Sequence, residues 1–347
     1  MSDDIKFMQR CLQLAQCGEA GATPNPMVGA VVVCDGRIIG EGYHRRCGGP
    51  HAEVNAIRSV KEKHLLSRST IYVSLEPCSH YGKTPPCTEL IIKSGIPRVV
   101  VGCIDAFAEV NGLGIKKLQE AGCEVVVGVL EKECRELNRR FFTFHQKHRP
   151  WVLLKWAQSE DEYIGAYPQP LPKGGVTNRS ITPSPLERAG ERLLFSNPLT
   201  QTLVHRLRAR CQAILVGTNT ALVDNPSLTT RHWQGPNPLR LTIDRKGILP
   251  PDLLLKDGST PTIIYTHESL PEILNDLYRR GIQSLLVEGG AKLLQSFIDT
   301  GLWDEARIEI APIRLGQGIK APTLSNHQQK RVNNYGGHII QYFRHET

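Results

Sequence analysis

Apolar residues in the first 130 positions recur at two spacings, one typical of helices and the other of strands. Residues 4–17 carry an apolar side chain every three or four positions, which predicts an amphipathic helix. An unbroken apolar run at 28–34 predicts a buried strand, and 37–43 has the pattern of its hairpin partner. Further helices and strands are predicted in alternation at 51–60, 69–78, 87–96, 98–105, 112–122 and 124–130. This alternation favours an α/β sandwich over about residues 1–130.

The same two spacings return after a basic segment, 133–150, that ends in proline. We place the domain boundary there, which gives domains 1–148 and 149–347. Five prolines and a Gly-Gly pair interrupt the pattern at 166–194, which predicts a loop or an insertion without a packed core. The other predicted elements lie at 151–159, 197–210, 213–217, 239–244, 261–266, 270–281, 283–290, 291–301 and 305–313. They indicate a second α/β unit.

Composition narrows the class of protein. The chain has 347 residues, of which 40% are hydrophobic and 22% charged, and this length fits two globular domains. Lys and Arg (42) outnumber Asp and Glu (34), a net charge of +8 that suits anionic ligands and leaves nucleic acid open as a partner. No apolar run approaches the ~20 residues of a membrane span. The charged first ten residues do not resemble a secretory signal, so we expect a cytoplasmic protein without a membrane partner.

Cysteine is concentrated in the first half of the chain, where nine of the ten cysteines lie. A disulfide framework is not expected in a cytosolic chain of this size. Two of these cysteines belong to the motif described next, and we predict that the other eight are free thiols, mostly in the core. Cys47 lies near His51 in the sequence, but it has no place in that motif.

The strongest chemical signal is a set of four residues, His51, Glu53, Cys78 and Cys87. One imidazole and two thiolates are good zinc ligands, and three protein ligands leave the fourth position of the metal open, as in catalytic sites. Zinc lowers the pKa of a bound water to near neutral pH. Glu53 is placed to take up a proton from that water and pass it to the ring nitrogen and the leaving amine. The order H-x-E, P-C and a second Cys is the pattern of zinc-dependent deaminases.

The spacing of the two cysteines departs from that of most zinc deaminases. Eight residues separate them in EPCSHYGKTPPC (76–87), whereas two are usual in tRNA, cytidine and nucleic-acid deaminases. This segment resembles the bifunctional deaminase/reductase of riboflavin biosynthesis, as do TPNPMVGA (23–30) and GYHRRCGGPHAE (42–53). Segments that resemble its reductase domain follow in the same order, LLKWAQS (153–159), HRLRAR (205–210), AILVGTNTALVDNPSLTTR (213–231), LRLTID (239–244) and LLVEGGAKLL (285–294). The resemblance covers nearly the whole chain except 166–194.

The resemblance implies two folds, two reactions and two cofactors. The folds are an N-terminal cytidine-deaminase-like three-layer α/β sandwich and a C-terminal dihydrofolate-reductase-like domain. Zinc-dependent hydrolysis removes the C2 amino group of a diamino-ribosylamino-pyrimidinone phosphate, and NADPH then reduces the ribosyl group to ribityl. The implied partner is this phosphorylated pyrimidine and not nucleic acid, and the implied assembly is a homo-oligomer.

The resemblance also implies roles for single residues of the deaminase half. His51, Cys78 and Cys87 match its zinc ligands, and Glu53 matches its proton-transfer residue. The substrate pocket is matched by Asn25, His44 and Lys83. A lysine in the cysteine loop suits this place, because its cation can neutralise a substrate phosphate.

In the reductase half, the matched positions form a cofactor group and a sugar-phosphate group. They are Ala157, Thr220 and Asp224 for NADPH, with Gly289 and Gly290 added from their context, and Arg208, Leu228, Arg231 and Glu288 for the sugar phosphate. Two arginines suit a phosphate, and glycines between a strand and a helix allow a cofactor phosphate to approach the backbone. No G-x-G-x-x-G is present, so a Rossmann domain is not supported. Lys155 is a candidate for substrate positioning or proton supply, and the sequence does not decide between these roles and a plain strand-end lysine.

Three segments depart from the family pattern. Asp105–Ala108 replaces D-P-N-P, so that Phe107 cannot make the polar contact of an asparagine. Ser159–Glu162 replaces the start of S-L-D-G-R and lacks its glycine. The usual G-x-S-x-W-I is replaced by the proline-rich segment and Leu194–Asn197. Our hypothesis is that 166–194 forms a mobile flap or a tolerated insertion, and that the reductase stays active.

Two other classes of protein were weighed against the bifunctional enzyme. A nucleoside or nucleic-acid deaminase with an appended non-catalytic domain would account for the charge of +8. The long cysteine spacing and the lack of an aromatic, basic platform for unstacked bases argue against it. A structural zinc module would leave Glu53 unexplained and would normally close the site with a fourth ligand.

Overall fold

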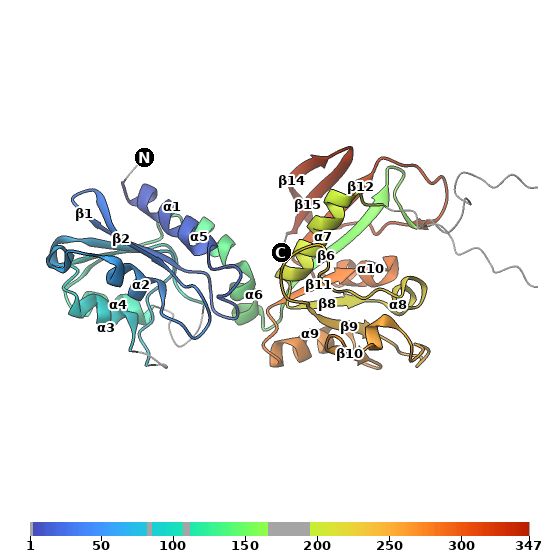
Figure 1. The fold of residues 1–347 in the computed structure, drawn as a ribbon, viewed down its shortest axis with the longest axis horizontal. Coiled ribbons are helices and arrows are strands. Elements are labelled where there is room, and N and C mark those ends of the chain that lie inside the picture. Colours follow the sequence, from blue (N-terminus) through green and yellow to red (C-terminus); the bar gives the residue numbers. More distant parts are fainter. Residues whose placement is uncertain (1–2, 82–84, 107–111, 166–194, 347) are drawn as a thin grey trace, which may run out of the picture. The chain divides into compact units, whose positions relative to one another are not determined.

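The computed structural model describes residues 3–81, 85–106, 112–165 and 195–346 (Figure 1). The chain divides into two compact units, Met1–Arg149 and Pro150–Thr347. Within the described residues, no helix has the length and apolar character that a membrane crossing requires.

The first unit is built on a five-stranded sheet in the order β2-β1-β3-β4-β5. Its strands are β1 (Gly29–Cys34), β2 (Arg37–Tyr43), β3 (Thr70–Val73), β4 (Arg98–Val101) and β5 (Glu124–Val127). β1 pairs antiparallel with β2 and β3, whereas β3, β4 and β5 run parallel. The hairpin predicted from 28–34 and 37–43 is confirmed.

Helices cover both faces of this sheet. They are α1 (Asp3–Gln16), α2 (Ala52–Ser59), the 3-10 helix η1 (Lys63–Arg68), α3 (Cys87–Lys93), α4 (Leu113–Glu120), α5 (Glu131–Leu137) and α6 (Arg139–Lys147). Because successive strand residues point to opposite faces, Ala30 and Val32 pack with α2, α3 and α4, while Val31 and Val33 pack with α1, α5 and α6. This gives the predicted three-layer sandwich (Figure 1).

The second unit contains an eight-stranded sheet in the order β10-β9-β8-β11-β6-β12-β15-β14, and a two-stranded sheet of β13 and β7. The strands are β6 (Trp151–Ser159), β7 (Tyr163–Gly165), β8 (Ala213–Val216), β9 (Leu239–Ile243), β10 (Thr262–Tyr265), β11 (Ser284–Glu288), β12 (Glu305–Ala311), β13 (Ile319–Lys320), β14 (His327–Tyr335) and β15 (His338–His345). The strands from β10 to β12 are parallel, and β15 and β14 continue the sheet in antiparallel pairing.

Each face of the large sheet carries its own helices. They are α7 (Pro198–Arg210), α8 (Thr218–Asp224), the 3-10 helix η2 (Leu254–Lys256), α9 (Leu270–Arg279) and α10 (Ala291–Asp299). Trp156 and Leu215 pack with α9 and α10, whereas Leu153 and Ile214 pack with α7 and α8. Because strand residues alternate, Lys155 and Ala157 share the face of Leu153.

The sequence analysis missed several elements of this unit, among them α8 and the strands β7, β13, β14 and β15. Helix α8 was not separated from its surroundings in 213–231, and no strand was predicted after 313. Gly336 and Gly337, both with positive φ, join β14 to β15 and are a typical hairpin turn. β14 lies at the sheet edge and is mostly exposed, so it lacks the apolar alternation that reveals a strand.

Candidate active sites

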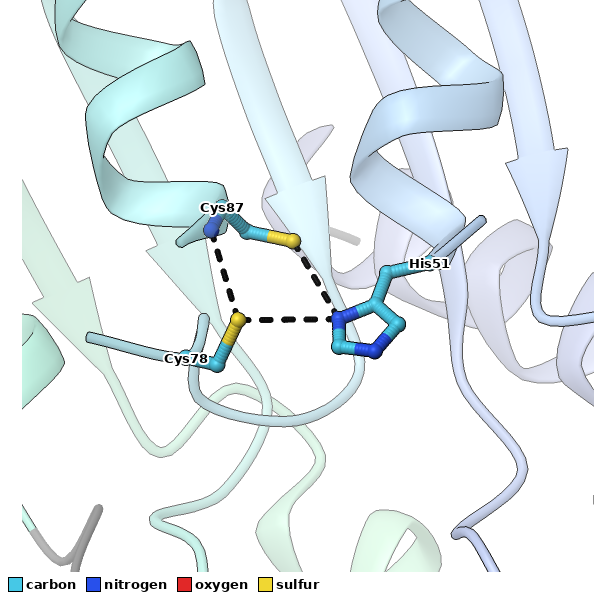
Figure 2. Close-up of side chains that lie close together, drawn as sticks. All are labelled: His51, Cys78 and Cys87. Carbon is cyan, nitrogen blue, oxygen red and sulfur yellow. Dashed lines mark hydrogen bonds between the residues drawn. The ribbon is translucent and has the colours of Figure 1, made fainter. Parts of the chain in front are cut away.

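Three side chains of the first unit converge where two helices begin (Figure 2). His51 precedes α2 as its N-cap, Cys78 lies in the loop after β3, and Cys87 is the first residue of α3. The His51 Nδ1 atom lies 3.6 Å from the Cys78 Sγ and 3.4 Å from the Cys87 Sγ. The element predicted at 51–60 is thus a helix that begins at Ala52, which leaves His51 at the cap.

The protonation states of these three groups depend on one another. Hydrogen bonding to Cys87 and to His51 lowers the pKa of Cys78 to about 4, whereas Cys78 and burial raise the pKa of Cys87. The hydrogen bond with Cys78 raises the pKa of His51 to about 9. Metal binding replaces the protons of such ligands. The donor atoms lie within 4.8 Å of one another, so one imidazole and two sulfurs fit a zinc ion. In the part of the chain that the structure describes, no other cluster of this kind occurs.

Glu53 lies in the first turn of α2 and is only 3% exposed. Burial raises the pKa of its carboxyl, and the neighbouring His51 opposes this increase. Glu53 is not part of the cluster of ligand atoms. A buried carboxyl beside a metal site, with its pKa raised above the usual range, is suited to take up and release a proton.

Asn25 and His44, both predicted for the substrate pocket, contact each other beside His51. The His44 Nδ1 lies 3.1 Å from the Pro50 carbonyl oxygen, and its Nε2 lies 3.1 Å from the Asn25 Nδ2. Burial lowers the pKa of His44, so we assign a neutral ring that donates from Nδ1 and accepts at Nε2. The rings of His44 and His51 meet edge to face, with centroids 5.4 Å apart. Lys83 lies outside the described residues.

Glu76 is a buried carboxylate of this site that the sequence analysis did not single out. Its two oxygens accept hydrogen bonds from the backbone N–H groups of Gly112 and Gly114, each at 2.9 Å. A Cβ on Gly114 would lie 2.1 Å from the Pro77 carbonyl oxygen, so only glycine allows this approach. Glu76 therefore holds the start of α4 against the segment that carries Cys78. The position of Glu76 directly before Pro77 and Cys78 was the sequence signal that could have identified it.

In the second unit, three of the predicted cofactor residues, Gly289, Gly290 and Thr220, meet after β11. Gly289 and Gly290 both have positive φ, and a Cβ on either would lie 3.2 Å from a side-chain atom of Thr220. The turn before α10 therefore packs closely on α8, which also carries Asp224 at its end. Ala157 lies on β6, on the face shared with Leu153.

Glu288 and Arg208 form a buried ion pair at the end of β11. The Arg208 Nε and Nη2 donate to the two Glu288 oxygens at 3.1 and 2.7 Å. Burial alone would raise the pKa of Glu288, but Arg208 and Lys155 lower it to about 2. The charge of Arg208 is thus largely offset by Glu288, and its Nη1 donates to the Thr229 carbonyl at 3.2 Å. The place of Arg208 in the sugar-phosphate site stays a prediction.

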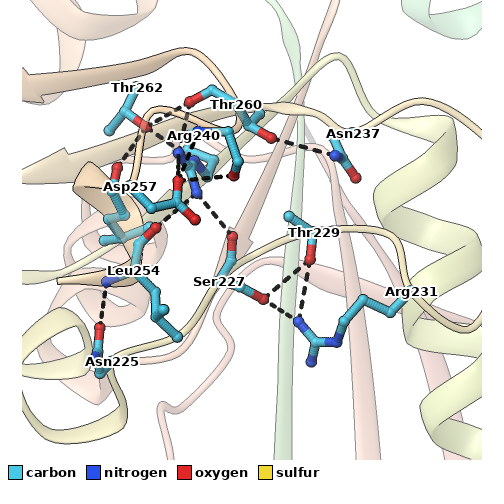
Figure 3. A network of polar contacts seen from close by, with 12 residues as sticks. Asn225, Ser227, Thr229, Arg231, Asn237, Arg240, Leu254, Asp257, Thr260 and Thr262 are labelled. Atoms are coloured by element: carbon cyan, nitrogen blue, oxygen red, sulfur yellow. Dashed lines mark hydrogen bonds and ion pairs between the residues drawn. The ribbon is translucent and has the colours of Figure 1, made fainter.

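Arg231 is the exposed member of the predicted arginine pair (Figure 3). Its Nη1 donates to the hydroxyls of Ser227 and Thr229. Leu228, between them, is 2% exposed and packs in the core with Leu153 and Leu286, so only its backbone is available to a ligand. The positive φ of Leu228 bends the loop at this point.

Arg240, from the motif LRLTID, anchors this loop from inside the protein (Figure 3). It is fully buried, and its Nη1 donates to the carbonyls of Ser227 at 3.4 Å and Leu254 at 2.9 Å. Its Nη2 donates to Asp257 at 2.9 Å and to the Thr260 carbonyl at 2.6 Å.

Two buried charges on β12 were also missed by the sequence analysis. Arg307 is 1% and Glu309 0% exposed. In the register of the sheet, Arg307 lies opposite Lys155 and Glu309 opposite Ala157. The segment EARIEIA places Glu305, Arg307 and Glu309 on one face of a strand. Three charged residues on the covered face of an internal strand were a signal of a polar site.

Each of the three segments that depart from the family pattern lies at least partly within the described residues. Glu162 has a φ of 65°, in the left-handed region that favours glycine, at the position where the family glycine is missing. Ser196 donates to Glu309 at 2.9 Å, and Asn197 caps α7 by accepting from the Thr200 N–H. Phe107 and 166–194 lie outside the described residues, so the flap hypothesis stays a prediction.

All ten cysteines are free thiols. Of the eight outside the zinc motif, five are buried, as predicted for most of them, at positions Cys11, Cys34, Cys103, Cys134 and Cys211. Cys47 is exposed.

Family models match both halves of the chain. Residues 1–103 match the cytidine and deoxycytidylate deaminase zinc-binding region, and residues 150–340 match the RibD C-terminal domain. The first match supports zinc as a cofactor of this domain.

Relatives match nearly the full length. The riboflavin biosynthesis protein RibD of Aquifex aeolicus is 35% identical, with 98% of each chain covered, and that of Escherichia coli is 34% identical, with 91% of this chain and 90% of the relative covered. A crystal structure of a diaminohydroxyphosphoribosylaminopyrimidine deaminase/5-amino-6-(5-phosphoribosylamino)uracil reductase from Thermotoga maritima is 36% identical, with a TM-score of 0.83 over 99% of this chain and 98% of that one. The structure of Acinetobacter baumannii RibD gives 30% identity and a TM-score of 0.84 over the same shares. The predicted fold class of both halves is confirmed, and the chain belongs to the RibD family of riboflavin biosynthesis proteins, which join a deaminase domain to a reductase domain.

Proposed function

We propose that this chain carries out two consecutive steps on one phosphorylated pyrimidine. The deaminase domain hydrolyses the C2 amino group of a diamino-ribosylamino-pyrimidinone phosphate and releases ammonia. The reductase domain then uses NADPH to convert the ribosyl group to ribityl. The observation that carries the first step is the convergence of His51, Cys78 and Cys87 beside the buried carboxyl of Glu53.

In the deamination, His51, Cys78 and Cys87 hold zinc, which supplies an activated water when it is bound. Glu53 takes up a proton at its carboxylate and delivers it first to the ring nitrogen and then to the leaving amino group. The raised pKa of Glu53 suits both acceptance and release. Asn25 keeps its amide oxygen and one N–H for the pyrimidine, because His44 occupies only the other N–H.

In the reduction, Gly289 and Gly290 together with Thr220 hold the cofactor, which supplies a hydride when it is bound. Their backbone N–H groups at the start of α10 suit a phosphate of NADPH. Arg231, exposed on its loop, attracts the phosphate of the substrate. Arg208 orients Glu288, which faces the sugar together with Lys155.

The test of the deamination is the variant Glu53→Gln. It keeps the shape of the side chain but cannot carry a proton, so we expect zinc content to stay at the wild-type value while ammonia release falls about 100-fold or more. Bound zinc is measured by elemental mass spectrometry, and ammonia release is measured by an enzyme-coupled assay. The control is Glu62→Gln, which removes an exposed carboxyl that forms an ion pair with His64. We expect this variant to keep the wild-type rates. Wild-type ammonia release in Glu53→Gln would refute the proton-transfer role.

The cytoplasmic location and the homo-oligomeric state inferred from the sequence stay predictions that accompany this proposal.

A further inference from the structure

A row of charged side chains crosses the middle of the large sheet beneath α7. Glu288 on β11 and Arg307 on β12 are the register neighbours of Lys155 on β6. Side chains directly opposite on neighbouring strands share a face, so Lys155 lies between a carboxylate and a guanidinium. Glu309 on β12 lies two residues further along the same face.

Within this row, Arg307 has few partners of its own. Its side chain is 1% exposed, and its Nη1 and Nη2 have no hydrogen-bond partner among the described residues. The Glu309 carboxylate, 3.8 Å away, is an ion-pair neighbour beyond hydrogen-bond distance. A buried guanidinium left in this state costs free energy that a better-paired or apolar residue would avoid. Packing alone therefore does not explain why arginine occupies this position.

We propose that Arg307 is a positioning residue of the reductase site, which acts through Lys155 and makes that side chain the proton donor of the reduction. This inference rests on the reduction proposed above. Conversion of a ribosyl to a ribityl group breaks the bond between C1′ and the ring oxygen. C1′ receives the hydride of NADPH, which leaves as NADP⁺, and the ring oxygen receives one proton. Lys155 supplies that proton and regains one from solvent.

The charges around Lys155 show how Arg307 acts. Burial lowers the pKa of Lys155; Glu288 and Glu309 oppose this change, whereas Arg307 and Arg208 add to it. His205, on α7, has its pKa lowered to about 4 mainly by burial and is neutral at pH 7. The positive charge of Arg208 is already offset by Glu288, to which Arg208 donates two hydrogen bonds. Within the described part of the chain, Arg307 has no such hydrogen bonds from its Nη atoms, and its nearest carboxylate, Glu309, lies 3.8 Å away. Its like charge therefore weakens the hold of Lys155 on its proton.

If Arg307 is a positioning residue, its removal changes the proton affinity of Lys155. Removal of a merely structural arginine would leave this affinity unchanged. Competitive labelling with acetic anhydride over a range of pH, with mass spectrometry of the peptide that contains Lys155, reports this affinity without any enzymatic turnover. For Arg307→Met we expect the labelling midpoint to rise by about one pH unit, because a like charge has been removed. Arg307→Lys keeps the charge and should label like the wild type.

NADPH oxidation provides the second readout. A general acid loses activity as the pH rises through its pKa, so the basic limb of the pH profile should move upward in Arg307→Met by the same amount as the labelling midpoint. Because Arg307 does not touch the cofactor in this account, KM for NADPH should stay within about twofold in Arg307→Met. The kcat at neutral pH should fall, because Lys155 then holds its proton more tightly and is a weaker acid. Arg344→Met, which removes an arginine of the same sheet that pairs with Glu305 at 3.7 Å, should leave both midpoints unchanged.

Tryptophan fluorescence checks that each variant is folded, and Arg307→Gln replaces Arg307→Met if the latter is not. An unshifted labelling midpoint in the folded charge-removing variant would overturn the role of Arg307. A zinc-loaded wild-type chain that releases ammonia but oxidises no NADPH would overturn the reduction itself, and with it the donor role of Lys155.

Discussion

Replacement of Arg240 by methionine should destabilise the second unit without touching any proposed ligand contact. Arg240 is fully buried and donates to the backbone carbonyls of Ser227 and Leu254. These two carbonyls lose a donor that carries a charge, whereas the Thr260 carbonyl keeps a hydrogen bond from Thr262 at 3.2 Å. Asp257 keeps its hydrogen bonds from Ser259.

The expected cost follows from these lost bonds. Hydrogen bonds that involve a charged group contribute about 1.5 kcal/mol or more each, so the two carbonyls give a loss of about 3 kcal/mol in the free energy of unfolding. For a domain of this size that corresponds to a decrease in Tm of roughly 6–12 °C. The methionine fills much of the space of the arginine stem, so we add no cavity cost.

The four tryptophans make this measurement specific to the second unit, because Trp151, Trp156, Trp233 and Trp303 all lie in it. Urea unfolding of the full chain followed by tryptophan fluorescence therefore reports on this unit. Arg280→Met, which removes an exposed ion pair with Asp276, is the control and should change stability by about 0.5 kcal/mol at most. A loss below about 1 kcal/mol in Arg240→Met would refute the view that Arg240 anchors the 225–231 loop.

Two further predictions concern the zinc ligands and the buried ion pair. Cys78→Ser should reduce bound zinc to less than about a tenth of one equivalent, because a hydroxyl replaces a thiolate ligand, while Cys47→Ser should keep a full equivalent in the same metal analysis; equal zinc in the two variants would rule out this ligand set. Arg208→Met should lower the free energy of unfolding at pH 7 by about 3 kcal/mol, because it leaves Glu288 buried without its partner. The pKa of Glu288 is lowered from 4.5 to about 2 in the fold, so its stabilising contribution is complete above pH 4.5 and is lost as the pH falls through 2. The difference between wild type and variant, measured by urea unfolding, should therefore shrink as the pH falls from 5 to 2, and a constant difference would contradict the assigned ion pair.

The deaminase site was the part of the molecule most accessible from the sequence. His51 and Glu53 are close in the chain, and Cys78 and Cys87 stand at the end of a strand segment and the start of a helix. These features allow their convergence to be predicted. Asn25 and His44 were assigned to the substrate pocket only through the resemblance, and their contact was not predicted, since nothing in their spacing brings them together.

The reductase site was less accessible, because its charges come together through sheet pairing. The pairing of Lys155 with Glu288 and Arg307 joins strands that are more than 100 residues apart in the chain. Local patterns do not give such a register. The roles of the two arginines also could not be separated in advance, since only the fold shows that Arg208 is buried against Glu288 and that Arg231 is exposed.

The central claim is that one chain releases ammonia from the diaminopyrimidine phosphate and then reduces the product. The most direct test incubates the purified, zinc-loaded wild-type chain with this substrate and NADPH, and measures ammonia and NADPH consumption in the same reaction. Our account predicts that both proceed to completion in equal amounts, with no NADPH oxidation in Glu53→Gln until the deaminated pyrimidine is added. NADPH oxidation by Glu53→Gln on the undeaminated substrate, or ammonia release by the wild type without NADPH oxidation, would contradict it.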